Sequence, residues 1–316
     1  MSLLSIFATA ILPVVVVAAA GFALGRMKGT DPDALNTITV YVLAPALVVH
    51  SLTTSALAGD TILSVVLAVL LFTAAMLAVA EAVGRLTGHS EPLLGAFVLV
   101  AVFPNTGNYG IPLADFAFGA TGRSTAVLVT ALQGVLLYTV GIYIAARGNA
   151  SSPLADMRRV FGVPLVYAVV VALALRWLGA VPPADSTLMQ TLELLGNASI
   201  PVMLLILGIQ LSSVDGDSSL ESVGTASAMK LLLAPVLAFA AVLAVGFQNQ
   251  TVARVVVLLL ATPTGVTTII LVGAFSHGTG ERSPGELVSA TVFLTTVVSA
   301  VTVTVLVWLL QSGWML

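Results

Sequence analysis

Apolar residues occur in long runs separated by short polar segments along the whole chain. Each run is about 20 residues long, the length that an α-helix needs to cross the hydrocarbon core of a bilayer. The only sizeable polar connections lie around 147–158 and 212–221. The pattern predicts an all-α membrane protein with ten transmembrane helices, at 3–25, 33–55, 61–84, 92–119, 122–146, 160–178, 187–211, 222–246, 251–276 and 286–311.

Composition agrees with this prediction and excludes several classes of function. Hydrophobic residues make up 59% of the chain and charged residues 8%, with a mean hydropathy of +1.11, whereas a soluble domain carries roughly 25% charged residues. The net charge of −3 predicts no nucleic-acid partner, and a chain without cysteine forms no disulfide. Nucleotide-binding and hydrolase motifs are missing from the sequence, and His50, His89 and His277 are far apart in it. We therefore expect no enzyme activity, no cofactor and no metal.

Lysine and arginine residues predict how the helices are oriented. Seven of the eleven basic residues fall in loops opposite the N-terminus, three fall on the N-terminal side, and Lys230 lies inside a span. Because basic loops stay in the cytoplasm, we expect a multi-pass protein of the cell membrane with both termini outside. The first run has no basic residue before it, whereas Arg26 and Lys28 follow it. We interpret it as a retained helix rather than a signal peptide.

The two halves of the chain share residues at corresponding positions, which predicts an internal repeat. Five spans per copy is an odd number, so the copies must have opposite orientations in the membrane, as in inverted-repeat transporters. The expected units are a first repeat at 1–146, a cytoplasmic linker at 147–159 and a second repeat at 160–316. A shift of 159 residues pairs Pro104 with Pro263, Gly119 with Gly278 and Arg123 with Arg282, and a slightly shorter shift pairs Pro13 with Pro164 and Arg26 with Arg176.

Helix-breaking residues interrupt one span in each half. Proline removes a backbone donor, and glycine loosens a helix. Two broken helices at corresponding positions indicate a binding site in the middle of the membrane, where exposed N–H groups and helix N-termini favour an anion such as a carboxylate. The alternative is a pair of kinked helices whose polar side chains only satisfy the freed carbonyl groups. The predicted helix-breaking residues are Pro104, Gly107, Gly110, Pro112, Pro263 and Gly265.

Several stretches resemble the auxin efflux carrier family, which includes the plant PIN-FORMED proteins and many prokaryotic relatives. The run Asn105 to Pro112, followed by Phe118 and Gly119, is similar to the family's fourth-span motif. The long hydrophilic loop of the plant members is missing here, so regulation that resides in it does not carry over. Weaker resemblances are "LNTITVYVLAPAL" (Leu35–Leu47), "LQGVLLYT" (Leu132–Thr139) and "GNASIPVMLLILG" (Gly196–Gly208).

The resemblance implies two inverted five-helix repeats whose broken helices 4 and 9 cross, as in sodium/proton antiporters and bile-acid symporters. It implies a scaffold of spans 1, 2, 6 and 7 that forms a homodimer, and a transport core of spans 3–5 and 8–10. The core would shift in an elevator-like movement. The implied substrates are small organic anions, such as auxin-like or dicarboxylic acids.

Polar side chains near the two breaks are the candidate substrate ligands. Asn105 and Asn108 are expected to donate amide N–H groups to a carboxylate near the crossing point. Tyr109 is expected either to act as a gate or substrate contact or to pack, and Gln133 either to line the pore or to face a partner helix. The full set is Asn105, Thr106, Asn108, Tyr109, Gln133, Thr264, Thr267 and Thr268.

Ionisable residues inside the spans are candidates for ion coupling. Asp115 is expected either to carry a coupling proton or to reach the outer surface. Glu81 and Arg85 lie four residues apart on one helix face, which predicts an ion pair that is either functional or merely solvated. His50 is predicted to lie deep in the second span, either titrating or as a hydrogen-bonding core residue. Lys230 is expected to extend its side chain to the cytoplasmic face.

We therefore predict a secondary transporter of small organic anions in a lipid membrane, with protons and sodium as the candidate coupling ions. Two other classes stay open. A channel of the same fold would need a continuous wet path, and a membrane receptor or scaffold protein would need the breaks to be simple kinks.

Overall fold

The computed structural model describes residues 3–55, 57–147, 164–212, 220–275 and 283–312. Within these residues the regular structure is helical, apart from one isolated bridge between Pro104 and Thr264. By length and composition, seven of these helices are able to cross a membrane, and three shorter apolar helices accompany them. The chain is therefore an all-helical multi-pass membrane protein, as its composition predicts.

The long helices follow the predicted spans to within a few residues. The predicted span 61–84, for example, is the helix Gly59–Leu86. The predicted boundary between spans 92–119 and 122–146 coincides with Gly119, a non-helical residue at which the helical stretch from Thr106 to Ala145 is kinked into two helices. Gly119 has φ 60° and ψ −147°, a conformation that residues with a Cβ atom rarely adopt. Some predicted positions lie outside the described residues. They are the start of the predicted sixth span, residue 276 at the end of the predicted ninth span, Gly278, Arg282 and most of the 147–159 linker.

The first half of the chain contains three continuous spans, one interrupted helix and a connection through Gly119. Short π-helical turns join several α-helices without interrupting them. The helices are α1 (Leu3–Ile6), η1 (Phe7–Ile11), α2 (Leu12–Lys28), α3 (Asp33–Ile38), η2 (Thr39–Leu43), α4 (Ala44–Thr53), α5 (Gly59–Leu86), α6 (Leu93–Val102), η3 (Thr106–Gly110), α7 (Ile111–Leu136), η4 (Leu137–Gly141) and α8 (Ile142–Ala145).

The second half has a similar succession of long helices and one interruption. Pro201 lies inside the long helix α11. The helices are α10 (Pro164–Trp177), α11 (Thr187–Ser212), α12 (Leu220–Ala228), η6 (Met229–Leu233), α13 (Ala234–Val245), α14 (Gln250–Leu260), α15 (Thr267–Phe275) and α16 (Pro284–Gln311).

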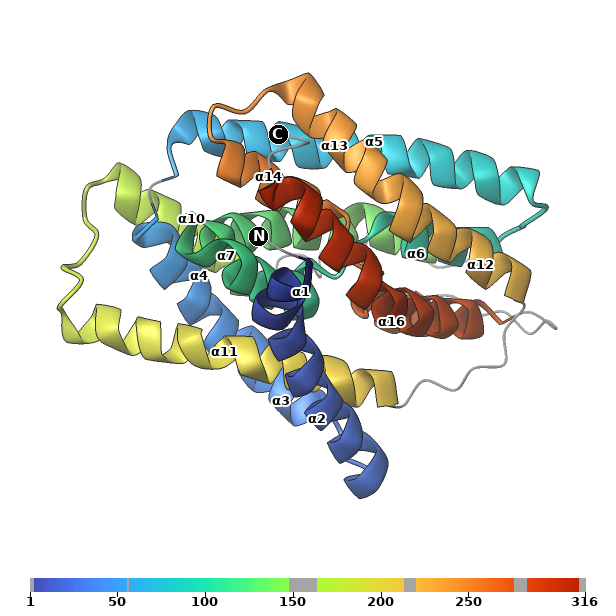
Figure 1. The fold of residues 1–316 in the computed structure, drawn as a ribbon, viewed down its shortest axis with the longest axis horizontal. Coiled ribbons are helices and arrows are strands. Elements are labelled where there is room, and N and C mark those ends of the chain that lie inside the picture. The colour runs from blue at the N-terminus through green and yellow to red at the C-terminus, as the bar shows by residue number, and fades with distance from the viewer. Residues whose placement is uncertain (1–2, 56, 148–163, 213–219, 276–282, 313–316) are drawn as a thin grey trace.

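Helices of the two halves pack against each other in two groups (Figure 1). In the first group, α11 lies along α2 and α4, and α10 packs on α4. In the second group, α13 lies along α5, α14 packs on α7, and α16 packs on α6 and α12. Contacts of α7 and η3 with α4 and α11 join the groups, so the interface between them passes beside the first break.

Glycines let α2 and α11 approach until their backbones touch. A Cβ atom added to Gly208 would lie 1.9 Å from the carbonyl oxygen of Ala18, and one added to Gly21 would lie 2.3 Å from that of Leu205. Small residues at such contacts are the usual means by which membrane helices pack closely. The first group is therefore held by direct backbone packing.

Candidate functional site

The first break separates α6 from the helical turns that lead into α7. Helix α6 ends at Val102, Phe103 is extended (φ −89°, ψ 112°), and helical structure resumes at Thr106. The interruption is therefore shorter than the sequence predicts. Gly107 and Gly110 lie within the turn η3, and Pro112 lies in the first turn of α7, where its missing N–H disrupts nothing.

The second break lies between the end of α14 at Leu260 and the start of α15 at Thr267. The two interrupted segments meet and run antiparallel. The backbone N–H of Asn105 donates to the carbonyl of Pro263 (2.7 Å), and that of Gly265 donates to the carbonyl of Phe103 (2.9 Å). The broken helices of the two halves therefore cross at their breaks, which is the arrangement that the resemblance implies.

Threonine hydroxyls replace the hydrogen bonds that the two prolines remove. Pro104 has no N–H for the carbonyl of Val100, and Thr264 Oγ1 of the other break donates to that carbonyl instead (2.8 Å). The carbonyl four residues before Pro263 belongs to Leu259 and accepts from Thr262 Oγ1 (2.7 Å). Both side chains are fully buried, so for these threonines the satisfaction of freed carbonyls is the observed role.

A cavity of about 210 Å³ lies beside the crossing. It extends to Val40 in η2 and Ile270 in α15, whose side chains are exposed. One wall comes from α3, η2, α10 and α11, and the other from the two breaks, α7, η4 and α15. The polar lining residues are Asn36, Thr39, Asn105, Thr106, Asn108, Thr130, Gln133, Tyr138, Gln210, Thr267 and Thr268.

Several buried polar atoms in this lining have no protein partner among the described residues. They include Asn105 Nδ2, Gln133 Oε1, Thr39 Oγ1 and Thr130 Oγ1. The other end of the Gln133 amide is held, because Nε2 donates to Thr73 Oγ1 (3.4 Å). A buried polar group without a partner is costly, so these atoms indicate a place for a polar ligand or water.

Among the described residues that line it, there is no lysine, arginine, histidine, aspartate or glutamate. Recognition in this cavity therefore rests on amides, hydroxyls and the backbone. The helical segments that begin at Thr106 and Thr267 both start at the cavity wall. Several of the first N–H groups, those of Thr106, Thr268 and Ile269 among them, already donate to backbone carbonyls. The helix starts still carry partial positive charge, which stabilises an anion. Such a wall is chemically better suited to negative than to positive charge.

Most of the predicted substrate ligands lie together in this wall, but two do not. Tyr109 is buried and accepts a hydrogen bond from Ser299 Oγ (3.1 Å), so it packs between α7 and α16. Thr264 is bonded within the crossing. The predicted ligands that line the cavity are Asn105, Thr106, Asn108, Gln133, Thr267 and Thr268, and the helix-breaking residues Pro104, Gly107 and Gly265 line it with them.

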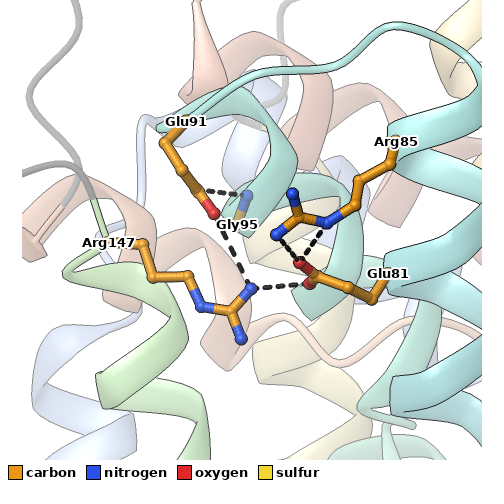
Figure 2. Close-up of polar contacts among 5 residues, drawn as sticks. All are labelled: Glu81, Arg85, Glu91, Gly95 and Arg147. Carbon is orange, nitrogen blue, oxygen red and sulfur yellow. Dashed lines mark hydrogen bonds and ion pairs between the residues drawn. The ribbon is translucent and has the colours of Figure 1, made fainter.

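The predicted ion pair of Glu81 with Arg85 is confirmed and belongs to a larger network (Figure 2). Arg85 Nη2 lies 2.6 Å from Glu81 Oε1, and Arg147 Nη1 lies 2.6 Å from Glu81 Oε2 and 3.7 Å from Glu91 Oε1. Glu91 Oε2 accepts the backbone N–H of Gly95 in the first turn of α6. The network ties α5, the start of α6 and the end of α8 together at one end of the molecule, outside the cavity lining.

Asp115 is paired with a basic residue. Arg123 binds it through Nε to Oδ1 (2.8 Å) and through Nη2 to Oδ2 (3.0 Å). The third guanidinium nitrogen, Nη1, donates to Asn197 Oδ1 on α11 (2.7 Å). This contact joins the two groups of helices and lies outside the cavity lining.

Two other ionisable residues lie elsewhere than expected. His50 lies in the last turn of α4, not deep in the second span. Lys230 does not reach a surface. Its side chain is fully buried, and its Nζ lies 3.4 Å from the carbonyl oxygen of Leu260.

The structure also adds polar residues that the sequence patterns do not single out. Thr39, Thr130 and Gln210 line the cavity from positions outside the two breaks. Isolated polar residues in apolar helices were the only signal for them. Sequence alone does not show which helices face the two breaks, so these residues could not be separated from ordinary helix-packing groups.

Comparison with known proteins assigns the chain to a family. Residues 6–155 and 152–307 match the family described as membrane transport protein. A protein of Rhizobium meliloti named "Putative malonate transporter" is 27% identical over 288 residues, covering 88% of this chain and 87% of that protein. An uncharacterized transporter of Methanocaldococcus jannaschii is 22% identical over 299 residues, covering 91% and 92%. One of Methanothermobacter thermautotrophicus is 22% identical over 279 residues, covering 88% and 89%. The chain belongs to the membrane transport protein family, the auxin efflux carrier family that its fourth-span motif resembles.

Proposed function

We propose that this protein is a secondary transporter of small carboxylates, which it binds in the cavity beside the crossing of the broken helices. The observation that carries this proposal is the set of buried polar atoms without partners, Asn105 Nδ2 and Gln133 Oε1 among them, in a wall where two helices begin. Amide donors and helix N-termini suit a carboxylate, and the neutral wall releases an anion more easily than an arginine would.

The size of the cavity and the comparisons support a small substrate. A cavity of about 210 Å³ is below the range of roughly 300–1,000 Å³ that drug-sized ligands occupy. The Rhizobium meliloti relative carries malonate in its printed name. We propose the class of short mono- and dicarboxylates, with malonate as the first compound to test.

The proposed mechanism is alternating access by an elevator-like movement. We infer ten membrane-spanning segments in two inverted repeats, with α6 to α7 and α14 to α15 as the interrupted pair. The scaffold would be α1–α4, α10 and α11, and the transport core would be α5–α8 and α12–α16. This division is supported by the packing of the helices in these two groups and by the cavity between them. Val40 and Ile270 of the lining are exposed, so we infer that the cavity opens on their side in this state of the cycle.

Flux through liposomes containing the purified protein tests the proposal. Vesicles loaded with unlabelled malonate should take up labelled malonate by saturable exchange, and acetate, succinate and indole-3-acetate should compete according to size. A channel would instead give fast, voltage-dependent flux without counterflow. If none of these anions moves, the protein is no carboxylate transporter, and a receptor function becomes the better interpretation.

A further inference from the structure

Lys230 is a buried charged residue next to the second break. It lies in η6, the eleventh residue of the span that begins at Leu220, and its side chain is fully buried. Its Nζ lies 3.4 Å from the carbonyl oxygen of Leu260, the last residue of α14. It also lies 5.8 Å from the centroid of the Phe72 ring. The last carbonyls of a helix carry partial negative charge, so this position favours a cation.

Few contacts offset the free-energy cost of burying this ammonium group. One long carbonyl contact and one aromatic ring replace the water shell of a charge inside a membrane protein. No carboxylate of the described residues lies within ion-pair distance of Lys230. Helices α6 and α13 contain no ionisable residue. The charged residues of the other surrounding helices lie within two turns of a helix end. They are Asp60, Glu81, Arg85, Glu221, Arg254 and Glu286. Two further titratable residues, His89 and Tyr109, are hydrogen-bonded to Ser222 and Ser299.

The lysine is connected to the cavity through the crossing itself. Leu260, its partner, is followed directly by the interrupted segment 261–266. In that segment the carbonyl of Pro263 accepts the backbone N–H of Asn105, whose side chain lines the cavity. Lys230 therefore contacts the helix end that leads into the second break, and residues of the same break line the cavity, whose described lining carries no charge.

We propose that Lys230 is the proton-binding site of the transport cycle, so that an anion in the cavity and a proton on Lys230 stabilise each other. This inference rests on the proposed function. An anion beside the break supplies the negative charge that the ammonium group otherwise lacks, and the ammonium group supplies the positive charge that the cavity wall lacks. By linkage, each ligand raises the affinity for the other by the same factor.

The step is a simple proton transfer. The Lys230 amine gains one proton from the side on which the anion enters and becomes an ammonium group. It returns that proton on the other side when the anion leaves. One proton then accompanies each anion, and a pH gradient drives accumulation. The proposed coupling group is therefore Lys230, next to the second break. The other candidates, Asp115, Glu81 and His50, lie outside the cavity lining. Asp115 and Glu81 are also held in ion pairs.

Liposomes containing the full-length protein test the inference. Potassium and valinomycin hold the membrane potential at zero, and the external pH is set one unit below the internal pH. Labelled malonate, or the panel anion with the fastest exchange, should accumulate on the order of tenfold per pH unit at equilibrium. Exchange without any effect of the pH gradient would overturn the inference and leave the proposed function standing. No exchange of any panel anion would remove both.

Variants then identify the residue. Lys230→Arg stays protonated, so it should exchange anions but no longer accumulate them in response to the pH gradient. Lys230→Met should lose the gradient response and also bind the anion more weakly. The matched control is Lys28→Met, which changes the other lysine of the chain, at the exposed end of α2, and should behave as the wild type. Wild-type accumulation by folded Lys230→Arg protein would overturn the assignment, and its exchange activity shows whether that variant is folded.

Discussion

The backbone N–H of Asn105 donates to the carbonyl of Pro263 at 2.7 Å, so the two breaks form one hydrogen-bonded structure. Residues 158 positions apart thereby share a single non-helical region at the crossing. The side chain of Asn105 projects from that region as part of the cavity wall. A ligand in the cavity therefore lies against the hydrogen-bonded crossing that joins the two halves of the chain.

Asn108 is the most direct test of the site. Its side chain is half-buried in the cavity wall, and among the described residues no protein group accepts or donates a hydrogen bond to it. Asn108→Ala should therefore leave folding near normal and weaken substrate binding on the order of tenfold, the loss of about one hydrogen bond to a charged group. Saturation of malonate exchange measures this. Unchanged affinity and flux would remove Asn108 from the site.

Thr264 and Thr267 separate the structural role of the crossing from the binding role. Thr264→Val deletes the donor to the carbonyl of Val100 and should lower the free energy of unfolding by about 1–3 kcal/mol. Thr267 lines the cavity without a side-chain partner, so Thr267→Val should keep the melting temperature and reduce anion affinity. Thermal unfolding in detergent and exchange kinetics on both variants check the contrast. Equal effects on stability would contradict it.

The close contact of α2 with α11 predicts a strong effect of one methyl group. In Gly208→Ala the new Cβ would lie 1.9 Å from the carbonyl oxygen of Ala18, so the helices must separate, which should cost about 1–3 kcal/mol of stability. Gly224→Ala is the control, because nothing lies within 4 Å of its Cβ position. That variant should keep or raise the melting temperature. A stable Gly208→Ala variant would show that the helices are less tightly packed.

Much of the fold follows from the sequence because the membrane leaves few choices. Apolar runs of spanning length must become helices, and residues such as Pro104 and Pro263 must interrupt them. The helix-breaking pattern therefore locates the crossing correctly. It overestimates the first interruption, since Pro112 is tolerated in the first turn of a helix and does not break it.

The side-chain environments were harder to predict. Thr264 and Thr267 look alike in the sequence, yet one bonds across the crossing and the other lines the cavity. Lys230 lies close enough to a helix end to reach water, and only the packing of α5 and α14 shows that it points inward. Such distinctions depend on which helices face each other, which neither periodicity nor composition contains.

The ion-pair network at the start of α6 predicts a local change in dynamics (Figure 2). Glu91 Oε2 accepts the backbone N–H of Gly95, a bond that caps the helix. Glu91→Gln keeps the shape of the side chain but loses the charge and its attraction to Arg147. We expect the Gly95 amide to exchange its hydrogen about fivefold faster, which corresponds to about 1 kcal/mol. Hydrogen exchange with mass spectrometry measures this, and an unchanged rate would show that the cap does not depend on charge.

The contact between Arg123 and Asn197 predicts how the transporter changes state. Arg123 lies on α7 of the proposed core and Asn197 on α11 of the proposed scaffold, and their side chains are joined at 2.7 Å. The contact lies outside the cavity lining and holds core and scaffold in their present relative position, so it must break if the core slides to the alternative state. Asn197→Ala should therefore increase the population of the alternative state, by about five- to tenfold for the loss of a charged hydrogen bond.

Since the natural chain has no cysteine, one introduced cysteine can report on that population. In the Thr267→Cys background the reporter lies in the cavity wall, and a membrane-impermeant maleimide added from one side of the membrane labels only the state open to that side. Asn197→Ala should slow labelling from the side to which the present state opens and speed it from the other. Gln190→Ala, at an exposed position of the same helix α11, should leave both rates unchanged. Equal acceleration from both sides would mean that the variant loosens the protein, and the contact would then have no role in selecting one state.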